Sequence, residues 1–116
     1  MRRKTIVVIL MVLAGALVGC LGPKGGKMKL PDNAVLLDVR QADEFNAGHI
    51  DGAVLVPHDM IAEKIGAVVL DKNTPVYIYC RSGRRSAIAV EAMRKLGYTN
   101  LTDFGGMDEA KKRLRK

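Results

Sequence analysis

Short apolar runs alternate with helix-like segments from residue 34 onward, and this alternation restricts the fold more than any other feature of the sequence. The runs that have the length and composition of strands are found at 34–39, 53–56, 75–80 and 100–104. The helical patterns are found at 41–48, at 59–69, at 84–96 and after Gly105 and Gly106. Strands that alternate with helices through short connections indicate a parallel sheet with right-handed crossovers. We therefore expect an α/β fold, in which a small parallel sheet is flanked by helices.

The core of such a fold has to be built mainly from aliphatic side chains. The chain has 116 residues, which suits one small domain, and 48% of its residues are hydrophobic while only 4% are aromatic. The clearest helix, at 84–96, carries Ile88, Ala92 and Leu96 at helical spacing, and the glycine at 97 is typical of a helix end. We expect this apolar stripe to face the core.

Residues 1–20 have the features of an export signal. Three cations at 2–4 precede an apolar run at 6–18. The run is shorter than the roughly 20 residues of a membrane span and has the length of the apolar region of a signal peptide. It leads through small residues to Cys20, in a pattern that resembles the lipobox of bacterial lipoproteins. In that family the cysteine becomes the mature N-terminus and carries lipid. The alternative is an uncleaved anchor helix that continues to residue 21.

Both interpretations of this segment predict an exported domain that is tethered to a membrane. We expect a lipoprotein signal peptide at 1–19, a flexible tether at 20–30 and a folded domain at 31–116. Lipid on Cys20 would place the domain in the cell envelope. In a Gram-negative cell we expect the periplasmic side of the outer membrane, because residue 21 is not the aspartate that usually retains lipoproteins at the inner membrane.

The charge of the chain argues against nucleic acid as a partner. The formal net charge is +7, and loss of residues 1–19 removes three of the 19 cations, which leaves 16 against 12 acids. These cations are not interleaved with aromatic side chains, as they would be on many nucleic-acid surfaces. Several lie in a basic tail at 111–116, where cations are attracted to the C-terminus of a helix. Contact of this tail with a membrane surface is the alternative explanation.

Cys80 stands at the end of the strand-like run 75–80. Cys20 is the only other cysteine, so its lipidation would leave Cys80 without a disulfide partner. The residues that follow, at 81–86, include three arginines and lead directly into a helix. Ligands of open α/β sheets bind outside the carboxyl ends of the strands, and a helix N-terminus at that place favours an anion.

These surroundings predict a reactive thiolate. We expect Gly83 to make the turn into the helix, because glycine adopts the backbone angles that such a turn requires. The pKa of a free thiol is about 8.5, and positive surroundings lower it to roughly 3.5–7.5. A small buried hydrophobe is the other common role of a cysteine at a strand end.

The sequence CRSGRRS closely resembles the active-site loop of rhodanese-like sulfurtransferases. The resemblance continues with LLDVR, EF, GHIDGA and VP before the loop and with GY, N and GG after it, over residues 35–106. The small, exported, single-domain members are the most similar. The resemblance implies that the Cys80 thiolate takes the outer sulfur of a donor such as thiosulfate, releases sulfite, and passes the sulfur to cyanide or a thiol. The loop that binds the substrate would consist of Arg81, Ser82, Gly83, Arg84, Arg85 and Ser86.

The same resemblance implies the supporting residues and the partners. Asp38, Arg40 and Glu44 would hold the loops around the site, while His49 and His58 would take no part in catalysis. No metal or organic cofactor is expected. The expected partners of this monomer are a small-molecule sulfur donor, a thiol acceptor and a thioredoxin-like redox protein.

The sequence departs from the family pattern in two places. Many members carry a tryptophan shortly after the Gly-Gly pair, where this chain has Met107, Asp108 and Glu109, so we expect a different pocket rim. Many members also have a strand and a helix before the LLDVR strand, where this chain has only KMKLPDN. We therefore expect a sheet of four strands, or of five strands with an irregular edge.

Two other kinds of function are compatible with a reactive cysteine on this fold. One is a sulfur carrier, a redox sensor or a docking domain, which would use the same loop without turnover. The other is a phosphatase or an arsenate reductase. The phosphatase signature, however, places an arginine six positions after the cysteine, where this chain has Ser86. The shorter loop suits one sulfur atom better than a tetrahedral phosphate, so sulfur transfer is the preferred prediction.

Overall fold

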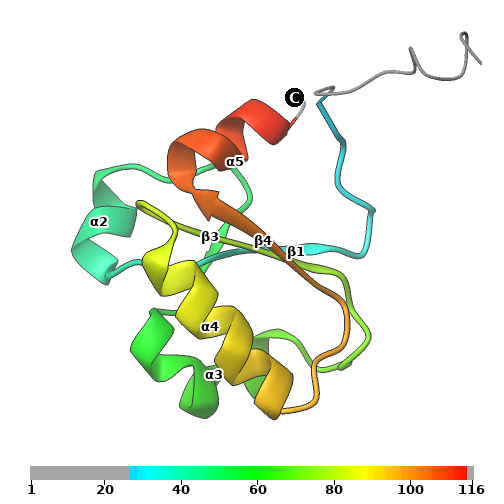
Figure 1. Cartoon of the computed structure of the whole chain (residues 1–116). Helices are drawn as coiled ribbons and strands as arrows, with labels where there is room; N and C mark the ends of the chain where they lie inside the picture. The colour runs from blue at the N-terminus through cyan, green and yellow to red at the C-terminus, as the bar shows by residue number, and fades with distance from the viewer. Residues whose placement is uncertain (1–26, 115–116) are drawn as a thin grey trace, which may run out of the picture.

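The computed structural model describes residues 27–114, in which four parallel strands form one sheet (Figure 1). The strands are β1 (Val35–Asp38), β2 (Val54–Leu55), β3 (Val76–Cys80) and β4 (Leu101–Gly106), in the order β2-β1-β3-β4. The predicted parallel α/β sheet is confirmed, with four strands among the described residues. The predicted signal peptide and most of the tether, Cys20 included, lie outside the described residues.

Helices cover both faces of the sheet (Figure 1). One face packs against α3 (Ile61–Val68) and α4 (Arg84–Lys95), and the other face packs against α5 (Met107–Arg113). The remaining elements are α2 (Ala42–Ala47), which follows β1, and the short 3-10 helix η1 (His58–Met60), which follows β2. Because all four strands are parallel, the loops that follow them meet at one edge of the sheet.

Two apolar clusters bury the sheet. The larger cluster lies between the sheet and helices α3 and α4, and it includes Val76, Ile78 and Cys80 of β3. The smaller cluster lies toward α5, and it includes Tyr79 of the same strand together with Phe104. Successive side chains of a strand point to opposite faces, and this alternation places Cys80 on the face that α4 covers.

The predicted core-facing stripe of α4 is wrong for two of its three residues, since only Ala92 packs against the core. Ile88 and Leu96 are 43% and 37% exposed, whereas the buried face consists of Ser86, Ala89, Val90 and Met93. The helix begins directly at the Cys80 loop, so the position of its first turn fixes which side meets the sheet. Small residues at 86 and 89 allow the helix to approach the sheet closely. A prediction of the buried face that relies on large apolar side chains does not detect these small residues.

The end of α4 agrees with the prediction. Gly97 has a φ of +100°, and its N–H donates to the carbonyl of Arg94 at 3.0 Å. The N–H of Tyr98 donates to the carbonyl of Met93 at 3.1 Å, which completes a Schellman motif. Over residues 27–114, no helix has both the length and the apolar character needed to cross a membrane.

Candidate active site

Cys80 is the last residue of β3 and opens a tight loop into α4. Its Sγ accepts a hydrogen bond from the Gly83 N–H, with 2.9 Å between nitrogen and sulfur. Gly83 precedes α4 directly and has a φ of +105°, which glycine adopts more readily than other residues. The Ser86 hydroxyl donates to the Gly83 carbonyl at 3.0 Å and so links the turn to the helix. The structure therefore has the predicted turn at Gly83.

The environment of Cys80 lowers the pKa of its thiol. Burial has the largest single effect and raises the pKa, because it disfavours the charged thiolate. Hydrogen bonds from the Ser86 hydroxyl and from the N–H groups of Ser86, Gly83 and Ser82 favour the thiolate, and together they outweigh burial. The Ser86 hydroxyl has one proton, which it can donate either to the Gly83 carbonyl or to sulfur. Hydrogen bonds of the loop, more than arginine charges, therefore stabilise the thiolate.

The three arginines of the loop have different surroundings. Arg85 forms an ion pair with Glu44 of α2, with distances of 2.7 and 3.0 Å between nitrogen and oxygen. Arg81 is exposed and lines a hollow at the edge of the sheet, whereas Arg84 is exposed and does not line that hollow. The charge of Arg85 is thus balanced by a carboxylate, and Arg81 is the loop arginine at the hollow.

Glu44 has two structural roles. The hydrogen bond from Arg85, and after it the one from the Gln41 N–H at 3.1 Å, lower the pKa of the Glu44 carboxyl to about 2. The bond to Gln41 is half of a capping box at the start of α2. Glu44 was expected to act together with Asp38 and Arg40, but its direct ion pair is with Arg85 in the Cys80 loop.

Asp38 and Arg40 form a buried ion pair at the end of β1. The Arg40 Nε and Nη2 atoms donate to the Asp38 carboxylate at distances from 2.7 to 3.1 Å. Arg40 Nη2 also donates to the Gly48 carbonyl at 2.7 Å, so the pair holds the segment after α2. The hydrogen bond from Arg40 to Asp38 is the main reason that the pKa of Arg40 is raised. Because both charges are buried, removal of either partner would leave the other uncompensated.

Gly106 at the end of β4 is a site residue that the sequence analysis did not single out. Gly106 pairs with Cys80 in the sheet and forms an isolated bridge with Ser82. A Cβ atom at this position would lie 2.7 Å from the Arg81 carbonyl oxygen and 2.8 Å from a Glu109 carboxylate oxygen. The Cys80 loop can lie against β4 only because residue 106 has no side chain. In the sequence, the GG pair at 105–106 is the feature that could have identified this residue.

A hollow of about 580 Å³ opens beside Arg81, where the loops after the strands meet. Its lining consists of Arg40, Glu44, Ala47, Gly48, Arg81, Met107, Asp108 and Lys111. Three of these residues are cations and two are acids, so the lining has a net positive charge, which favours an anion. Met107 and Asp108 lie in the segment where a different pocket rim was expected. Lys111 was assigned to the basic tail alone, and only the fold brings it to this hollow.

Among the described residues, neither histidine forms a hydrogen bond with Cys80. The His49 ring stacks on Phe45, with 3.7 Å between the ring centroids, and its Nδ1 is 2.9 Å from the Phe45 carbonyl oxygen. The Nδ1 of His58 is buried and has no hydrogen-bond partner within residues 27–114. In the same part of the chain, no three residues among His, Cys, Asp and Glu are grouped to hold a metal ion.

The four-stranded parallel sheet flanked by helices agrees with the fold that the motifs predicted. A sequence model of the rhodanese-like domain matches residues 26–113. The chain belongs to the rhodanese-like family. The family assignment made from the motifs is therefore confirmed.

The relatives of this chain include a protein named as a thiosulfate sulfurtransferase. The chain is 36% identical over 73 residues to thiosulfate sulfurtransferase PspE of Escherichia coli, which corresponds to 63% of this chain and 70% of PspE. It is 38% identical over 73 residues to the uncharacterised protein YqhL of Bacillus subtilis, where it spans 56% of the relative.

Solved rhodanese structures have the same fold. A structure of a rhodanese with anions from Escherichia coli is 34% identical and has a TM-score of 0.63, covering 66% of this chain and 89% of that chain. A rhodanese-related protein from Thermoplasma volcanium is 30% identical and has a TM-score of 0.58, covering 69% of this chain and 78% of that chain.

Proposed function

We propose that this protein is a sulfurtransferase that moves sulfane sulfur from thiosulfate, or a related donor, to a thiol or cyanide through a persulfide on Cys80. The observation that carries the proposal is the Cys80 sulfur, which lies 2.9 Å from the Gly83 N–H at the start of α4 and has a lowered thiol pKa. The similarity to a thiosulfate sulfurtransferase supports the choice of donor.

In the first step the Cys80 thiolate attacks the outer sulfur of thiosulfate. A new sulfur–sulfur bond forms on Cys80, the sulfur–sulfur bond of thiosulfate breaks, and its electron pair leaves with sulfite. The charges balance, because a thiolate and a dianion become a persulfide anion and a dianion. This is nucleophilic covalent catalysis, and it needs no general base once the thiol is ionised.

In the second step the acceptor attacks the terminal sulfur of the persulfide. The bond between the two sulfur atoms on Cys80 breaks, and the terminal sulfur is transferred to the acceptor. Cyanide becomes thiocyanate, an acceptor thiolate becomes a persulfide, and the Cys80 thiolate is restored. Between the two steps the anionic terminal sulfur requires hydrogen-bond donors. The N–H groups of Ser82, Gly83 and Ser86, which favour the thiolate, are suited to stabilise this anion as an oxyanion hole stabilises an oxygen.

Arg81 is the candidate residue for attracting the donor. It lines the hollow beside the Cys80 loop together with Arg40 and Lys111. The Arg40 charge is balanced by Asp38, and the Glu44 charge is balanced by Arg85. Within residues 27–114, the unpaired, exposed charges of this lining are those of Arg81 and Lys111, against the single acid Asp108, so one positive charge is in excess. A dianion such as thiosulfate would approach along this positive potential.

The phosphatase alternative has less support. Ser86 occupies the place of the signature arginine, is fully buried and bonds to the Gly83 carbonyl. The nearby Arg85 is held by Glu44 and so has a carboxylate in the place of a phosphate. A bidentate arginine contact to a phosphoryl group would require this ion pair to break.

We further propose that the domain is tethered to a membrane through lipid on Cys20, in the cell envelope. The support is the basic, apolar and small-residue order of residues 1–20. In a Gram-negative cell this proposal places the domain on the periplasmic side of the outer membrane.

Mass spectrometry of the intact protein tests the reaction directly. Incubation with thiosulfate should add one sulfur atom to Cys80, and cyanide should remove it as thiocyanate over many turnovers. Cys80→Ser should abolish both steps, since an alkoxide is too scarce at neutral pH to replace the thiolate. A single loading without repeated turnover would indicate the carrier role instead. Thiocyanate formation that survives Cys80→Ser, or robust hydrolysis of aryl phosphates, would refute the proposal.

A further inference from the structure

The first described residues of the chain lie beside the C-terminal end of α5. Met28 forms an isolated parallel bridge with Leu114, and its N–H donates to the Arg113 carbonyl at 2.7 Å. The chain before residue 27, with its apolar run at 6–18, therefore joins the domain next to the end of α5. Two segments that are far apart in the sequence form a single surface here.

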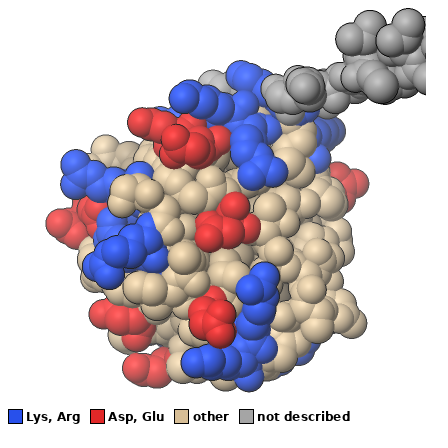
Figure 2. Space-filling model, in the orientation of Figure 1, with Lys and Arg blue, Asp and Glu red and all other residues tan. Residues whose placement is uncertain are grey.

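This surface is strongly basic. Its exposed cations, which we call the basic face, are Lys27, Lys29, Lys111, Lys112 and Arg113. The segments 27–30 and 111–114 contain no acidic residue. Figure 2 shows Lys and Arg side chains gathered around the place where the described chain begins. Attraction to the helix C-terminus explains the cations at the end of α5, and the adjoining segment adds Lys27 and Lys29 to the same positive surface.

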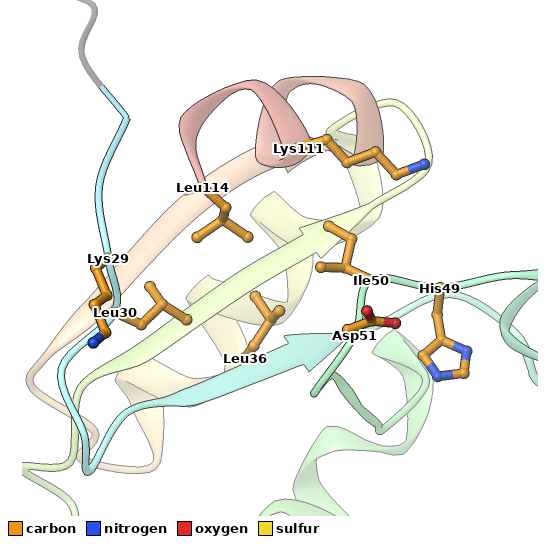
Figure 3. Close-up of a pocket in the computed structure, with 8 residues that line it drawn as sticks. All are labelled: Lys29, Leu30, Leu36, His49, Ile50, Asp51, Lys111 and Leu114. Atoms are coloured by element: carbon orange, nitrogen blue, oxygen red, sulfur yellow. The ribbon is translucent and has the colours of Figure 1, made fainter. Parts of the chain in front are cut away.

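A cavity of about 720 Å³ opens within this surface (Figure 3). Leu30, Leu36, Ile50 and Leu114 form its apolar part. Lys29 and Lys111 line it from opposite sides, and the remaining lining residues are His49 and Asp51. An apolar hollow between two lysines matches an amphiphile with an anionic head, and Asp51 is the one acid in its lining.

We propose that the basic face rests on the surface of an anionic phospholipid bilayer, with this cavity turned toward the lipid. The proposal rests on the membrane tether proposed for Cys20. The chain between Cys20 and Lys27 can span at most about 25 Å when it is fully extended. The alternative anchor helix, which would continue to residue 21, would hold the domain at least as close. Lysines attract anionic lipids only within about a Debye length of the membrane surface. Because the connection is short, the basic face often lies within this distance.

Docking in this way would also orient the sulfur site. Lys111 lines both the apolar cavity and the hollow beside Arg81. The hollow beside Arg81 would therefore lie at the border of the membrane-facing surface, accessible along the plane of the bilayer. Helices α3 and α4 cover the other face of the sheet and would point away from the lipid (Figure 1).

Lysine acylation followed by mass spectrometry can test the orientation on the full, lipid-anchored protein. The protein is incorporated into vesicles of phosphatidylcholine alone or of phosphatidylcholine with phosphatidylglycerol, and flotation first reports whether it is attached. We expect acylation of Lys27, Lys29, Lys111 and Lys112 to fall at least about threefold in the anionic vesicles. Lys64 of α3 and Lys95 of α4 should be acylated equally in both vesicles. In about 1 M salt, where the Debye length is about 3 Å, the protection should be lost.

Paired variants separate the basic face from general charge effects. Lys29→Gln with Lys112→Gln should remove most of the protection of Lys27 and Lys111, whereas Lys64→Gln with Lys95→Gln should preserve it. Equal acylation in both vesicles by attached protein, or an equal fall at all lysines, would overturn the docking face. Absence from both floating fractions would overturn the tether and the docking face together. Sulfur loading of Cys80, measured on the same samples, shows separately whether the proposed reaction fails.

Discussion

Arg85 at the start of α4 and Glu44 in α2 are joined by two hydrogen bonds of 2.7 and 3.0 Å. The residues are 41 positions apart in the sequence, and their side chains are about four-fifths buried. Because α4 begins at the Cys80 loop, this ion pair fixes the loop relative to the segment that follows β1. Glu44 also accepts a hydrogen bond from the Gln41 N–H, so one carboxylate both caps α2 and positions α4.

Glu44→Gln should lower the free energy of unfolding by about 1 kcal/mol at neutral pH, the upper range for a partly exposed ion pair. The amide keeps a capping oxygen but leaves Arg85 without an anion. The pKa of Glu44 is lowered to about 2 in the folded protein from an ordinary 4.5, so its stabilising effect is complete above the ordinary value. The effect is lost as the pH falls toward about 2. Urea unfolding of both proteins at several pH values measures the difference.

Asp43→Asn is the matched control for this measurement. Asp43 is exposed in the first turn of the same helix, so its neutralisation tests the helix dipole without the ion pair. If wild type and Glu44→Gln differ by the same free energy throughout the acid range, the ion pair is not the source of the effect.

Ser86→Ala should raise the pKa of the Cys80 thiol. The Ser86 hydroxyl is one of the hydrogen-bond donors that oppose the effect of burial, and its loss leaves burial less compensated. The midpoint of a thiol alkylation rate plotted against pH should therefore move to higher pH. Ser82→Ala is the control, because Ser82 contributes its backbone N–H, which the variant keeps. Superimposable profiles for Ser86→Ala and wild type would contradict this account.

Gly106→Ala should displace the Cys80 loop. The new Cβ would lie 2.7 Å from the Arg81 carbonyl oxygen, closer than packed atoms tolerate, so the loop or β4 has to shift. We expect a loss of about 1–3 kcal/mol of stability, as for other overpacked sites, and a clear fall in the rate of persulfide formation. Gly66→Ala in α3 is the control, since its Cβ meets nothing within 4 Å and alanine favours a helix. Equal behaviour of the two variants would show that the contact is unimportant.

Arg81→Gln should weaken the binding of thiosulfate more than Arg84→Gln does. Arg81 lines the hollow beside the loop, whereas Arg84 is also exposed but does not line it. We expect the KM for thiosulfate to rise several-fold in Arg81→Gln with little change in kcat, and to rise in wild type as salt screens the charge. Steady-state kinetics at low and high salt measures both effects. A KM that neither salt nor Arg81→Gln alters would rule out attraction of the donor by this residue.

Cys20→Ala should leave an unprocessed precursor. The small residues before Cys20 predict cleavage at that cysteine and lipid on it. Immunoblotting and mass spectrometry of membrane fractions should show the mature, lipid-bearing form only for the wild type. Leu21→Ala, which keeps the cysteine, serves as the control for the substitution itself. Mature protein of normal size from Cys20→Ala would reject the lipoprotein signal.

The local patterns of the sequence predicted most of the secondary structure. Apolar runs near residues 35, 54, 76 and 101 all form parallel strands, and the motif around Cys80 forms the expected turn into a helix. These features depend on residues close together in the chain. Strand composition, the freedom of Gly83 and the transition to a helical pattern are sufficient to predict them.

The orientation of α4 and the contacts of the site depended on distant segments. Ile88 and Leu96 have the helical spacing of a core stripe, yet the small residues Ser86 and Ala89 face the sheet instead. The partner of Glu44 could not be read from the sequence either, because Arg81, Arg84 and Arg85 all lie in the same loop and have the same charge.

By itself the sequence determined the α/β class, the order of strands and helices along the chain, the turn from Cys80 into a helix, and the family. Only the tertiary structure decided that Arg85 is paired with Glu44, that Gly106 makes room for the Arg81 carbonyl, and that segment 27–30 lies beside the end of α5. Periodicity and turn residues act over a few neighbouring positions. Contacts between distant segments depend instead on how closely the helices and the sheet pack, which no local pattern specifies.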